Sequence, residues 1–295
     1  METTLELLAE VHAGRRGPDP RTVTVTSVFW VHHGTRLAGG DTTYRNQYVL
    51  ARVGDSFGAC AFADGEIEPA VCADLSGLPV AELLDLPAPV RIATLDAYLA
   101  CVTPHRTSTV ERVTLPVGTP EVRANARDAA VAGLLPEVAG RKVALIGVVN
   151  PLVAAIRDRG AECLPCDLTL RTTRWGDPVT ADMRDVLDVA DAVVATGMTV
   201  GNGTFDEILD SCRHRGVPLV VYAQTGSAVV REFLGAGVTA LAAEPFPFSQ
   251  FSADETTLYA YRAWGSQWTN TSPTRSAGRP SSASTTGSPA CASRP

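Results

Sequence analysis

Three features that would indicate a membrane or secreted protein are missing from this sequence. No apolar run approaches the length needed to span a bilayer. The first residues, METTLE, contain neither the basic region nor the apolar region of a secretory signal. We therefore expect a soluble cytoplasmic protein with no membrane partner.

Clustered positive charge and paired cysteines are also missing. The 25 Lys and Arg residues are scattered and outnumbered by 32 Asp and Glu, which argues against a nucleic-acid partner. The seven cysteines are odd in number and mostly lie inside apolar stretches. Reduced thiols are therefore the first expectation, and disulfides the second.

The first part of the chain reads as strands followed by helices. Residues 3–13 carry apolar side chains at helical spacing, and the β-branched and aromatic run 22–32 is typical of a strand. Residues 47–53 and 58–62 flank Gly54-Asp55 and predict a hairpin. Helical periodicity follows over 79–86 and 92–102. This order predicts an α+β module.

The second part alternates strands with helices. Thr119-Pro120 indicates a helix start, and the apolar run 143–149 suits a central parallel strand. Asn150-Pro151 then suggests an N-cap and a first-turn proline. Further strands are expected at 162–168, 192–195, 218–222 and 238–242, with helices at 181–189, 205–215 and 228–234. The pattern predicts a Rossmann-like parallel sheet, which binds ligands beyond the carboxyl ends of its strands.

We therefore predict three regions. An α+β domain occupies residues 1–118 and a Rossmann-like α/β domain residues 119–265. The tail 266–295 is rich in Ser, Thr, Pro, Gly and Ala and has no acidic residue, which predicts disorder.

The strongest local motif is the glycine-rich loop from Thr196 to Asp206. Its glycines allow positive φ and close backbone approach, and Thr204 with Glu207 fits a capping box at the next helix. Asp206 is then free to contact a ligand, although a well-capped tight turn would explain the same residues. The candidate ligand-binding residues of this loop are Thr196, Gly197, Thr199, Asn202, Gly203, Thr204 and Asp206.

The charges near this loop limit the ligand class. Two carboxylates, Asp206 and Glu207, disfavour a polyphosphate, whereas a metal ion, an amine or a weakly anionic group fits better. The first strand also lacks the G-x-G-x-x-G pattern of dinucleotide binding. A second strand-to-helix loop offers Thr225 and Ser227, which either face the same crevice or cap the helix.

Soft metal ligands are the next candidates. Cys163 and Cys166 form a lone C-x-x-C, and Pro165 suggests that the strand ends there, which would turn both sulfurs to one side. The alternative is two buried structural thiols. His32 and His33 end the first long strand and point to opposite faces, so one of them could face an inter-domain crevice. The candidate metal ligands are Asp206, Cys163, Cys166 and His32.

Two stretches carry a family resemblance. Residues 143–149, together with 188–209 and their pattern A-D-x-V-x-x-T-G-x-x-x-x-N-G-T, resemble the putative heavy-metal-chelation family, a Rossmann-like domain of unknown function. Residues 53–58, 75–84 and 93–102 are similar to the enolase N-terminal-like module that usually precedes it. Where the family has Gly-Pro-Ser/Thr after the next strand, this chain has Ala223-Gln224-Thr225. The resemblance implies a role near metals.

Three functional hypotheses follow. The first is binding of a metal ion or small metal chelate between the two domains, in cofactor or metallophore metabolism, with a divalent or transition metal as the expected cofactor. The second is a biosynthetic enzyme that uses Asp206 as a general base and the helix start after Gly203 as an oxyanion site. The third is binding of a nucleoside cofactor such as S-adenosylmethionine, with Asp167 on the ribose. The expected partner is a small ligand, and a homo-oligomer is left open.

Overall fold

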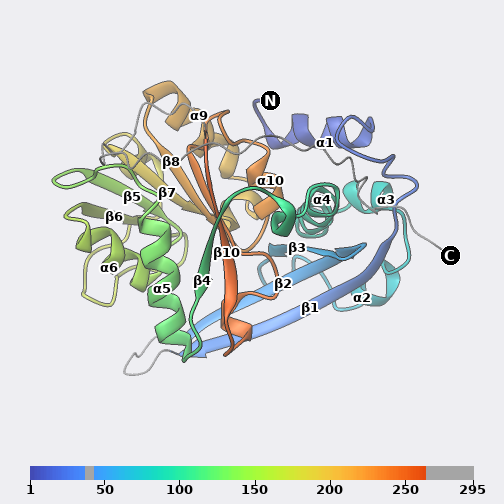
Figure 1. The fold of residues 1–295 in the computed structure, drawn as a ribbon, viewed down its shortest axis with the longest axis horizontal. Coiled ribbons are helices and arrows are strands. Elements are labelled where there is room, and N and C mark those ends of the chain that lie inside the picture. Colours follow the sequence, from blue (N-terminus) through green and yellow to red (C-terminus); the bar gives the residue numbers. More distant parts are fainter. Residues whose placement is uncertain (37–42, 264–295) are drawn as a thin grey trace, which may run out of the picture.

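The computed structural model describes residues 1–36 and 43–263, which form a mixed α/β structure with two sheets (Figure 1). The first sheet is antiparallel and contains β1 (Val25–Arg36), β2 (Thr43–Val53) and β3 (Ser56–Ala61) in that order. The hairpin between β2 and β3 turns at Gly54, whose φ is +57°. The predicted strands and hairpin of the first region are thus confirmed.

Helices cover one face of this sheet. α4 (Ala88–Val102) is almost entirely buried and packs on β3, with the short helices α2 (Val71–Asp74) and α3 (Val80–Leu84) before it. Contact between α4 and β3 is close because Gly58 has no side chain. A Cβ atom there would lie 2.0 Å from the backbone nitrogen of Ala97. The N-terminal helix α1 (Thr4–His12) confirms the predicted amphipathic helix.

The second sheet has seven strands in the order β4-β10-β9-β8-β7-β5-β6. Its parallel strands are β5 (Lys142–Ile146), β6 (Glu162–Cys166), β7 (Ala192–Thr196), β8 (Leu219–Ala223) and β9 (Ala240–Ala243). These confirm the predicted Rossmann-like sheet. β5 lies between β6 and β7, so the strand order reverses beside β5, where such sheets characteristically bind ligands.

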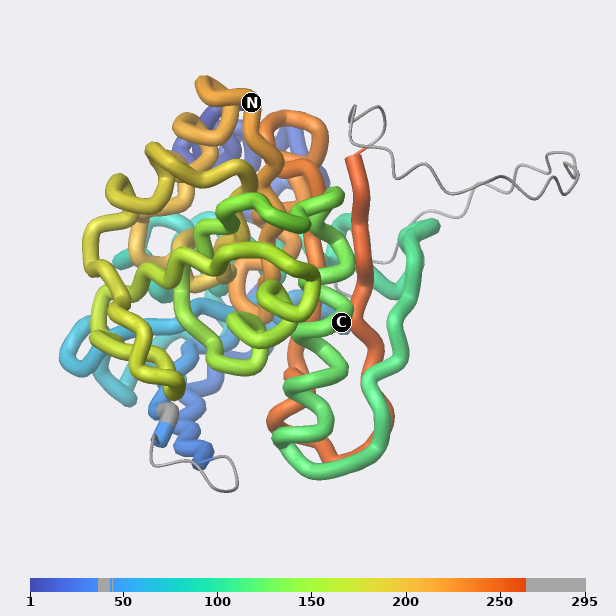
Figure 2. The backbone as a smooth tube through the Cα atoms, turned by 90° about the vertical axis from the view of Figure 1, so that its left-hand side faces the viewer, coloured from blue at the N-terminus to red at the C-terminus, as the bar shows by residue number. Residues whose placement is uncertain are grey.

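Two antiparallel strands extend this sheet and were not predicted. β10 (Thr256–Arg262) pairs with β9 on one side and with β4 (Glu111–Leu115) on the other. Figure 2 shows β4 and β10 side by side. β4 falls within the first predicted region, 1–118, yet it belongs to the second sheet.

Helices lie on both faces of the second sheet. α5 (Pro120–Ala132) and α6 (Asn150–Asp158) pack on one face, and α9 (Phe205–Arg215) and α10 (Ser227–Arg231) lie on the face shared with the first region. α7 (Arg184–Leu187) and α8 (Met198–Gly201) are single turns, so the helix predicted over 181–189 is shorter than expected. α5 begins as predicted, with Thr119 as N-cap and proline in the first turn.

The predicted cap of α6 is wrong. Val149 occupies the N-cap position, and Asn150 is the first helical residue. The side-chain oxygen of Asn150 instead accepts a hydrogen bond from the backbone nitrogen of Arg174, 3.0 Å away. A loop distant in sequence therefore uses the side chain that the sequence pattern assigned to the helix end.

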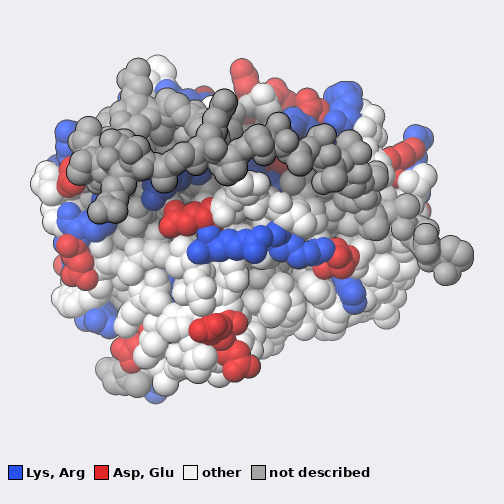
Figure 3. Space-filling model, in the orientation of Figure 1, with Lys and Arg blue, Asp and Glu red and all other residues white. Residues whose placement is uncertain are grey.

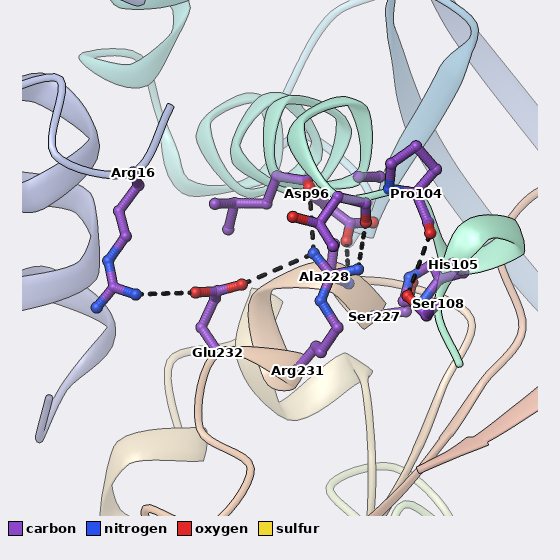
Figure 4. A network of polar contacts seen from close by, with 12 residues as sticks. Arg16, Asp96, Pro104, His105, Ser108, Ser227, Ala228, Arg231 and Glu232 are labelled. Carbon is purple, nitrogen blue, oxygen red and sulfur yellow. Dashed lines mark hydrogen bonds and ion pairs between the residues drawn. The ribbon is translucent and has the colours of Figure 1, made fainter. Parts of the chain in front are cut away.

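Polar groups cross the junction between the two regions (Figure 4). The buried carboxylate of Asp96 on α4 accepts hydrogen bonds from the backbone nitrogen of Ala59 on β3 (3.0 Å) and from that of Ala228 on α10 (2.7 Å). Burial raises the pKa of Asp96 to about 6, although both N–H donors favour the charged form. The folded chain therefore binds a proton here between about pH 6 and pH 4, where the unfolded chain does not, and this site adds stability as the pH falls.

A buried histidine joins the same junction. His105, in the 3-10 turn η1 (His105–Thr107), contacts the hydroxyl of Tyr261 through Nδ1 (2.7 Å) and that of Ser227 through Nε2 (3.2 Å). Burial, with Arg231 nearby, lowers the pKa of His105 to about 3. The imidazole therefore stays neutral in the folded protein at physiological pH.

The distribution of charge on the surface and the hydropathy of the helices can be compared with the sequence. Lys and Arg are interspersed with Asp and Glu on the face drawn in Figure 3. Within residues 1–36 and 43–263, no helix combines the length and hydropathy of a membrane span. The predicted disordered tail, 266–295, lies outside the described residues.

The neutral state of His105 predicts a pH dependence. Between pH 6.5 and about 3 the unfolded chain binds a proton at this site and the folded chain does not, so stability falls as the pH drops. We expect His105→Gln to flatten this acid limb of the free energy of unfolding, measured by urea denaturation from pH 7.5 to 4. His214→Asn, at an exposed histidine of α9, is the control and should keep the wild-type slope. Identical slopes for wild type and His105→Gln would contradict the assignment.

Candidate functional site

A pocket of about 130 Å³ lies beyond the carboxyl ends of β5 and β8. It is lined by His33, Thr35, Asn46 and Tyr48 of the β1–β2 hairpin, by Pro120, Ala124 and Arg127 of α5, by Val149 and Pro151 at the start of α6, and by Tyr222, Gln224 and Gln250. Both regions of the chain thus contribute walls. This is the place where an open α/β sheet presents its ligand site.

A larger surface cleft of about 530 Å³ lies elsewhere, between α1 and α3. All of its lining residues come from the first 85 of the chain: His12, Ala13, Gly14, Asp19, Arg21, Ala81, Glu82 and Asp85. Asp19 pairs with Arg21 at 2.7 Å, and His12 lies 3.4 Å from Asp85. Because the charged groups of this cleft are mostly paired with one another and the cleft is remote from the strand ends, the smaller pocket is the better candidate.

An ion pair stands at the α5 wall of the pocket. Nε and Nη2 of Arg127 donate to the carboxylate of the adjacent Asp128, at 2.7 and 3.1 Å. Burial alone would lower the pKa of Arg127, but the Asp128 carboxylate raises it above its usual value. The guanidinium also lies 5.1 Å from the ring centre of Tyr222. The side chain is therefore a fixed, permanently charged group.

The β8 wall is a chain of hydrogen bonds. The hydroxyl of Tyr222 and the amide of Gln224 both donate to the buried carboxylate of Glu244, at 2.8 and 3.0 Å. Gln224 and Gln250 also bond to each other through their amides, at 2.5 Å. Burial raises the pKa of Tyr222 well above its usual value and that of Tyr48 to about 12. Neither phenol can therefore act as a base at neutral pH.

His33 is the imidazole at the pocket, and His32, the predicted metal ligand, does not line it. His32 is exposed on the other face of β1, beside Trp30. Nε2 of His33 lies 2.7 Å from the hydroxyl of Thr35, while Nδ1 is buried without a hydrogen-bond partner among the described residues. Burial lowers the pKa of His33, which favours its neutral form.

The glycine-rich loop does not line this pocket. Thr199 donates to the backbone oxygen of Thr196 at 2.8 Å, and the loop closes into the turn α8. Gly201 packs on the first region, since a Cβ there would lie 2.6 Å from the sulfur of Cys60. Gly197 packs on the oxygen of Thr225 in the same way. Of the three loop glycines, Gly203 uses the permitted positive φ, at +79°, whereas Gly197 and Gly201 allow the close backbone approach.

The predicted capping box of α9 is also wrong. Thr204 occupies the N-cap position but makes no side-chain cap, and its hydroxyl donates to Asn202 at 2.8 Å. Glu207 pairs with Arg184 at 2.8 Å instead of reaching back to the helix start. Asp206 is not free, because it accepts bonds from the backbone nitrogen and the hydroxyl of Thr4, at 3.0 and 2.8 Å. The start of α9 therefore docks α1.

Other predicted residues are occupied in the same manner. Ser227 is the first residue of α10 and its hydroxyl faces His105, so it is not the N-cap. Thr225 is buried next to it. The hydroxyl of Thr196 is buried without a partner among the described residues, at the end of β7, where a Cβ on Gly147 would lie 2.3 Å from it. Thr196 thus keeps a buried polar atom without a partner among the described residues.

The two cysteines cannot share a metal ion. Both lie within β6, and they pack in the cores on opposite faces of the sheet, so the expected turn of both sulfurs to one side is wrong. Burial raises the pKa of Cys163 to about 12 and that of Cys166 to about 11. In the absence of a metal ion, both thiols are therefore protonated at neutral pH. Within the described residues, no three His, Cys, Asp or Glu side chains gather as a metal site.

The carboxylate of Asp167 is already hydrogen-bonded to the backbone and is not free to bind a ribose. Its carboxylate accepts backbone hydrogen bonds from Val148 (3.0 Å), Thr169 (2.8 Å) and Leu170 (3.0 Å). Burial would raise the pKa of Asp167, but these donors lower it below its usual value. The carboxylate fixes the loop after β5, so the geometry gives no support to the nucleoside hypothesis.

Sequence reasoning missed most of the pocket because its residues come from distant segments. Tyr48, Arg127 and Gln250 have no common motif. Gln224 was the one visible signal, since it stands where the resembling family has a different residue. The alternation of side chains along a strand would also have placed His33 and Thr35 on one face.

Comparison with known proteins supports the fold. Residues 130–243 match the family model described as "Putative heavy-metal chelation", DUF364. A DUF364 protein of unknown function from Desulfitobacterium hafniense DCB-2 has 16% identity and a TM-score of 0.57, over 88% of this chain and 98% of that chain. One from Pyrococcus horikoshii has 16% identity and a TM-score of 0.53, over 87% and 99%. No curated protein matches the chain in sequence. The predicted resemblance to this family and the Rossmann-like fold are confirmed.

The contacts of Asp206 and Thr204 give opposite expectations for two neighbouring substitutions. Asp206→Ala removes charge-assisted hydrogen bonds to α1 and should lower the free energy of unfolding by about 1.5 kcal/mol. Thr204→Ala removes no cap and should cost less than about 0.5 kcal/mol. Urea denaturation of both variants measures the difference. A larger loss of unfolding free energy for Thr204→Ala than for Asp206→Ala would support the capping box instead.

Proposed function

We propose that this chain binds a small polar organic molecule that chelates a metal ion, in the pocket between the two regions. Three points support the proposal: the heavy-metal-chelation description of the matching family, the position of the pocket at the strand ends, and its polar walls. Any metal would arrive as part of the ligand. A role in cofactor or metallophore metabolism belongs to the same proposal.

The observation that carries the proposal is the convergence of polar side chains from distant segments on one pocket. Asn46 and Tyr48 come from β2, Arg127 from α5, Gln224 from the end of β8 and Gln250 from the 3-10 turn η2 (Ser249–Phe251). Such groups cost free energy to desolvate, so a pocket that gathers them is suited to a ligand that restores their hydrogen bonds. Amides and hydroxyls suit an organic molecule better than a bare ion.

A bare metal ion fits the described residues poorly. Transition metals usually require three or four protein ligands, and the described residues contain no such group of His, Cys, Asp and Glu. The pocket wall itself offers one imidazole, His33. If Nε2 of His33 donates to Thr35, Nδ1 carries a lone pair that could complete the coordination of a metal already held by a chelator.

An enzyme acting on a small molecule is the alternative. Among the described residues, the wall of the pocket includes no carboxylate, and its two phenols stay protonated. Among the described wall residues, His33 is the remaining side chain that can accept a proton, and burial lowers its pKa. Binding is therefore the better supported of the two functions.

The test compares two adjacent histidines on opposite faces of β1. We expect His33→Ala to weaken binding of a small bidentate chelate, such as zinc picolinate, by roughly tenfold or more. The variant loses either a coordination bond to the metal or a hydrogen bond to the chelator, each made by the neutral imidazole. His32→Ala is the matched control and should bind like wild type. Isothermal titration with zinc alone, picolinate alone and the mixture measures each contribution.

Three outcomes separate the functions. Binding of the mixture above either component supports a chelate site. Tight stoichiometric binding of zinc alone, unchanged by His33→Ala, would overturn the proposal in favour of a metal site elsewhere. Chemical turnover of the added ligand, followed by mass spectrometry, would instead favour the enzyme.

A further inference from the structure

We propose that Arg127 receives a carboxylate of the ligand, so that the substrate class of this pocket is the small carboxylate chelators. This inference rests on the proposed function and narrows it. Of the described residues at the pocket wall, Arg127 is the one with a formal charge. The nearby carboxylates, Asp128 and Glu244, are not wall residues and lie behind it.

The hydrogen bonds of Arg127 leave one donor group over. Nε and Nη2 are used by Asp128, whereas Nη1 has no hydrogen bond within the described chain. Arg127 lines the pocket, and a carboxylate is the acceptor whose geometry a guanidinium edge matches best. Asp128 holds the plane of the guanidinium, so little conformational entropy remains to be lost on binding.

The start of α6 adds to the preference for an anion. Val149 and Pro151 line the pocket, so the positive end of this nine-residue helix faces the same space as Arg127. The guanidinium on α5 and the dipole of α6 therefore meet at one wall. Neither of them alone would name a ligand, but their coincidence in one pocket favours a single negative group.

Background charges decide which kind of anion fits. Asp128 and Glu244 carry one negative charge more than Arg127 balances, and Glu244 is buried among its three donors, Tyr222, Gln224 and Ser249. A free polyanion such as phosphate would meet repulsion from behind the wall. A carboxylate in a molecule that also holds a cation, as in a metal chelate, brings less net negative charge.

The experiment uses two chelators of the same size. Picolinate and picolinamide both bind zinc in a bidentate manner, but only picolinate has a carboxylate. We expect the wild-type protein to bind zinc picolinate at least about tenfold more tightly than zinc picolinamide, the difference typical of a hydrogen bond to a charged group. Inorganic phosphate should not compete. Isothermal titration of the full chain measures all three.

A double variant tests the residue itself. Arg127→Gln with Asp128→Asn removes both charges together, because removing one would leave the other buried and unpaired. We expect the preference for picolinate over picolinamide to fall to about threefold or less. Arg157→Gln with Asp177→Asn is the matched control, since this ion pair (2.8 Å) lies outside the pocket wall. Its preference should stay at the wild-type value.

The outcomes distinguish this inference from the proposed function. Equal binding of both chelators by wild type would overturn the carboxylate and leave the chelate site standing. A preference that survives in the double variant would remove Arg127 from the role. Failure of both chelators to bind would overturn the two proposals together. The wild-type comparison needs no variant, so it decides even if the double variant does not fold.

Discussion

The buried carboxylate of Asp96 is the interaction on which the rest of the arrangement depends. It sits on α4, and it binds one backbone nitrogen from β3 and one from the start of α10. The oxygen of Ala59 accepts a further bond from the nitrogen of Gly226, so the edge of the first sheet is fastened directly to the second region. This junction sets the distance between the β1–β2 hairpin and the strand ends of the second sheet. The pocket is the space that this distance leaves.

Much of the fold was predictable, because strands buried on both faces consist of consecutive apolar residues. β5, β7, β8 and β9 follow from such runs, and α5 follows from Thr119 and its proline. β10 and β4 were missed, since a pair of antiparallel strands at one edge alternates with polar residues and has no helix to mark it. The limits of the two domains and of the tail stay predictions.

The candidate site was less predictable, and the reason is physical. Capping and ligand-binding motifs use the same short polar side chains. These side chains can also form hydrogen bonds with distant segments, and a local sequence pattern does not show such contacts. Asp206 went to α1, Ser227 to His105 and Asn150 to a distant loop. What local reasoning did capture is that one of two adjacent strand histidines faces inward, which is a matter of strand geometry. Which one it is depends on register.

The close contact of β3 with α4 has a consequence for protein engineering. Gly58 leaves no space for a side chain between β3 and Ala97 of α4, and Asp96 on the same turn of α4 accepts a hydrogen bond from α10. The helix α4 therefore packs against both regions. A chimera that exchanges the first region with that of a distant relative, cut at the linker before α5, would import a foreign α4 against a native α10. Exchanges that transfer α4 together with residues 225–229 would keep the contact between α4 and α10. Recombination libraries should therefore take both segments from the same parent.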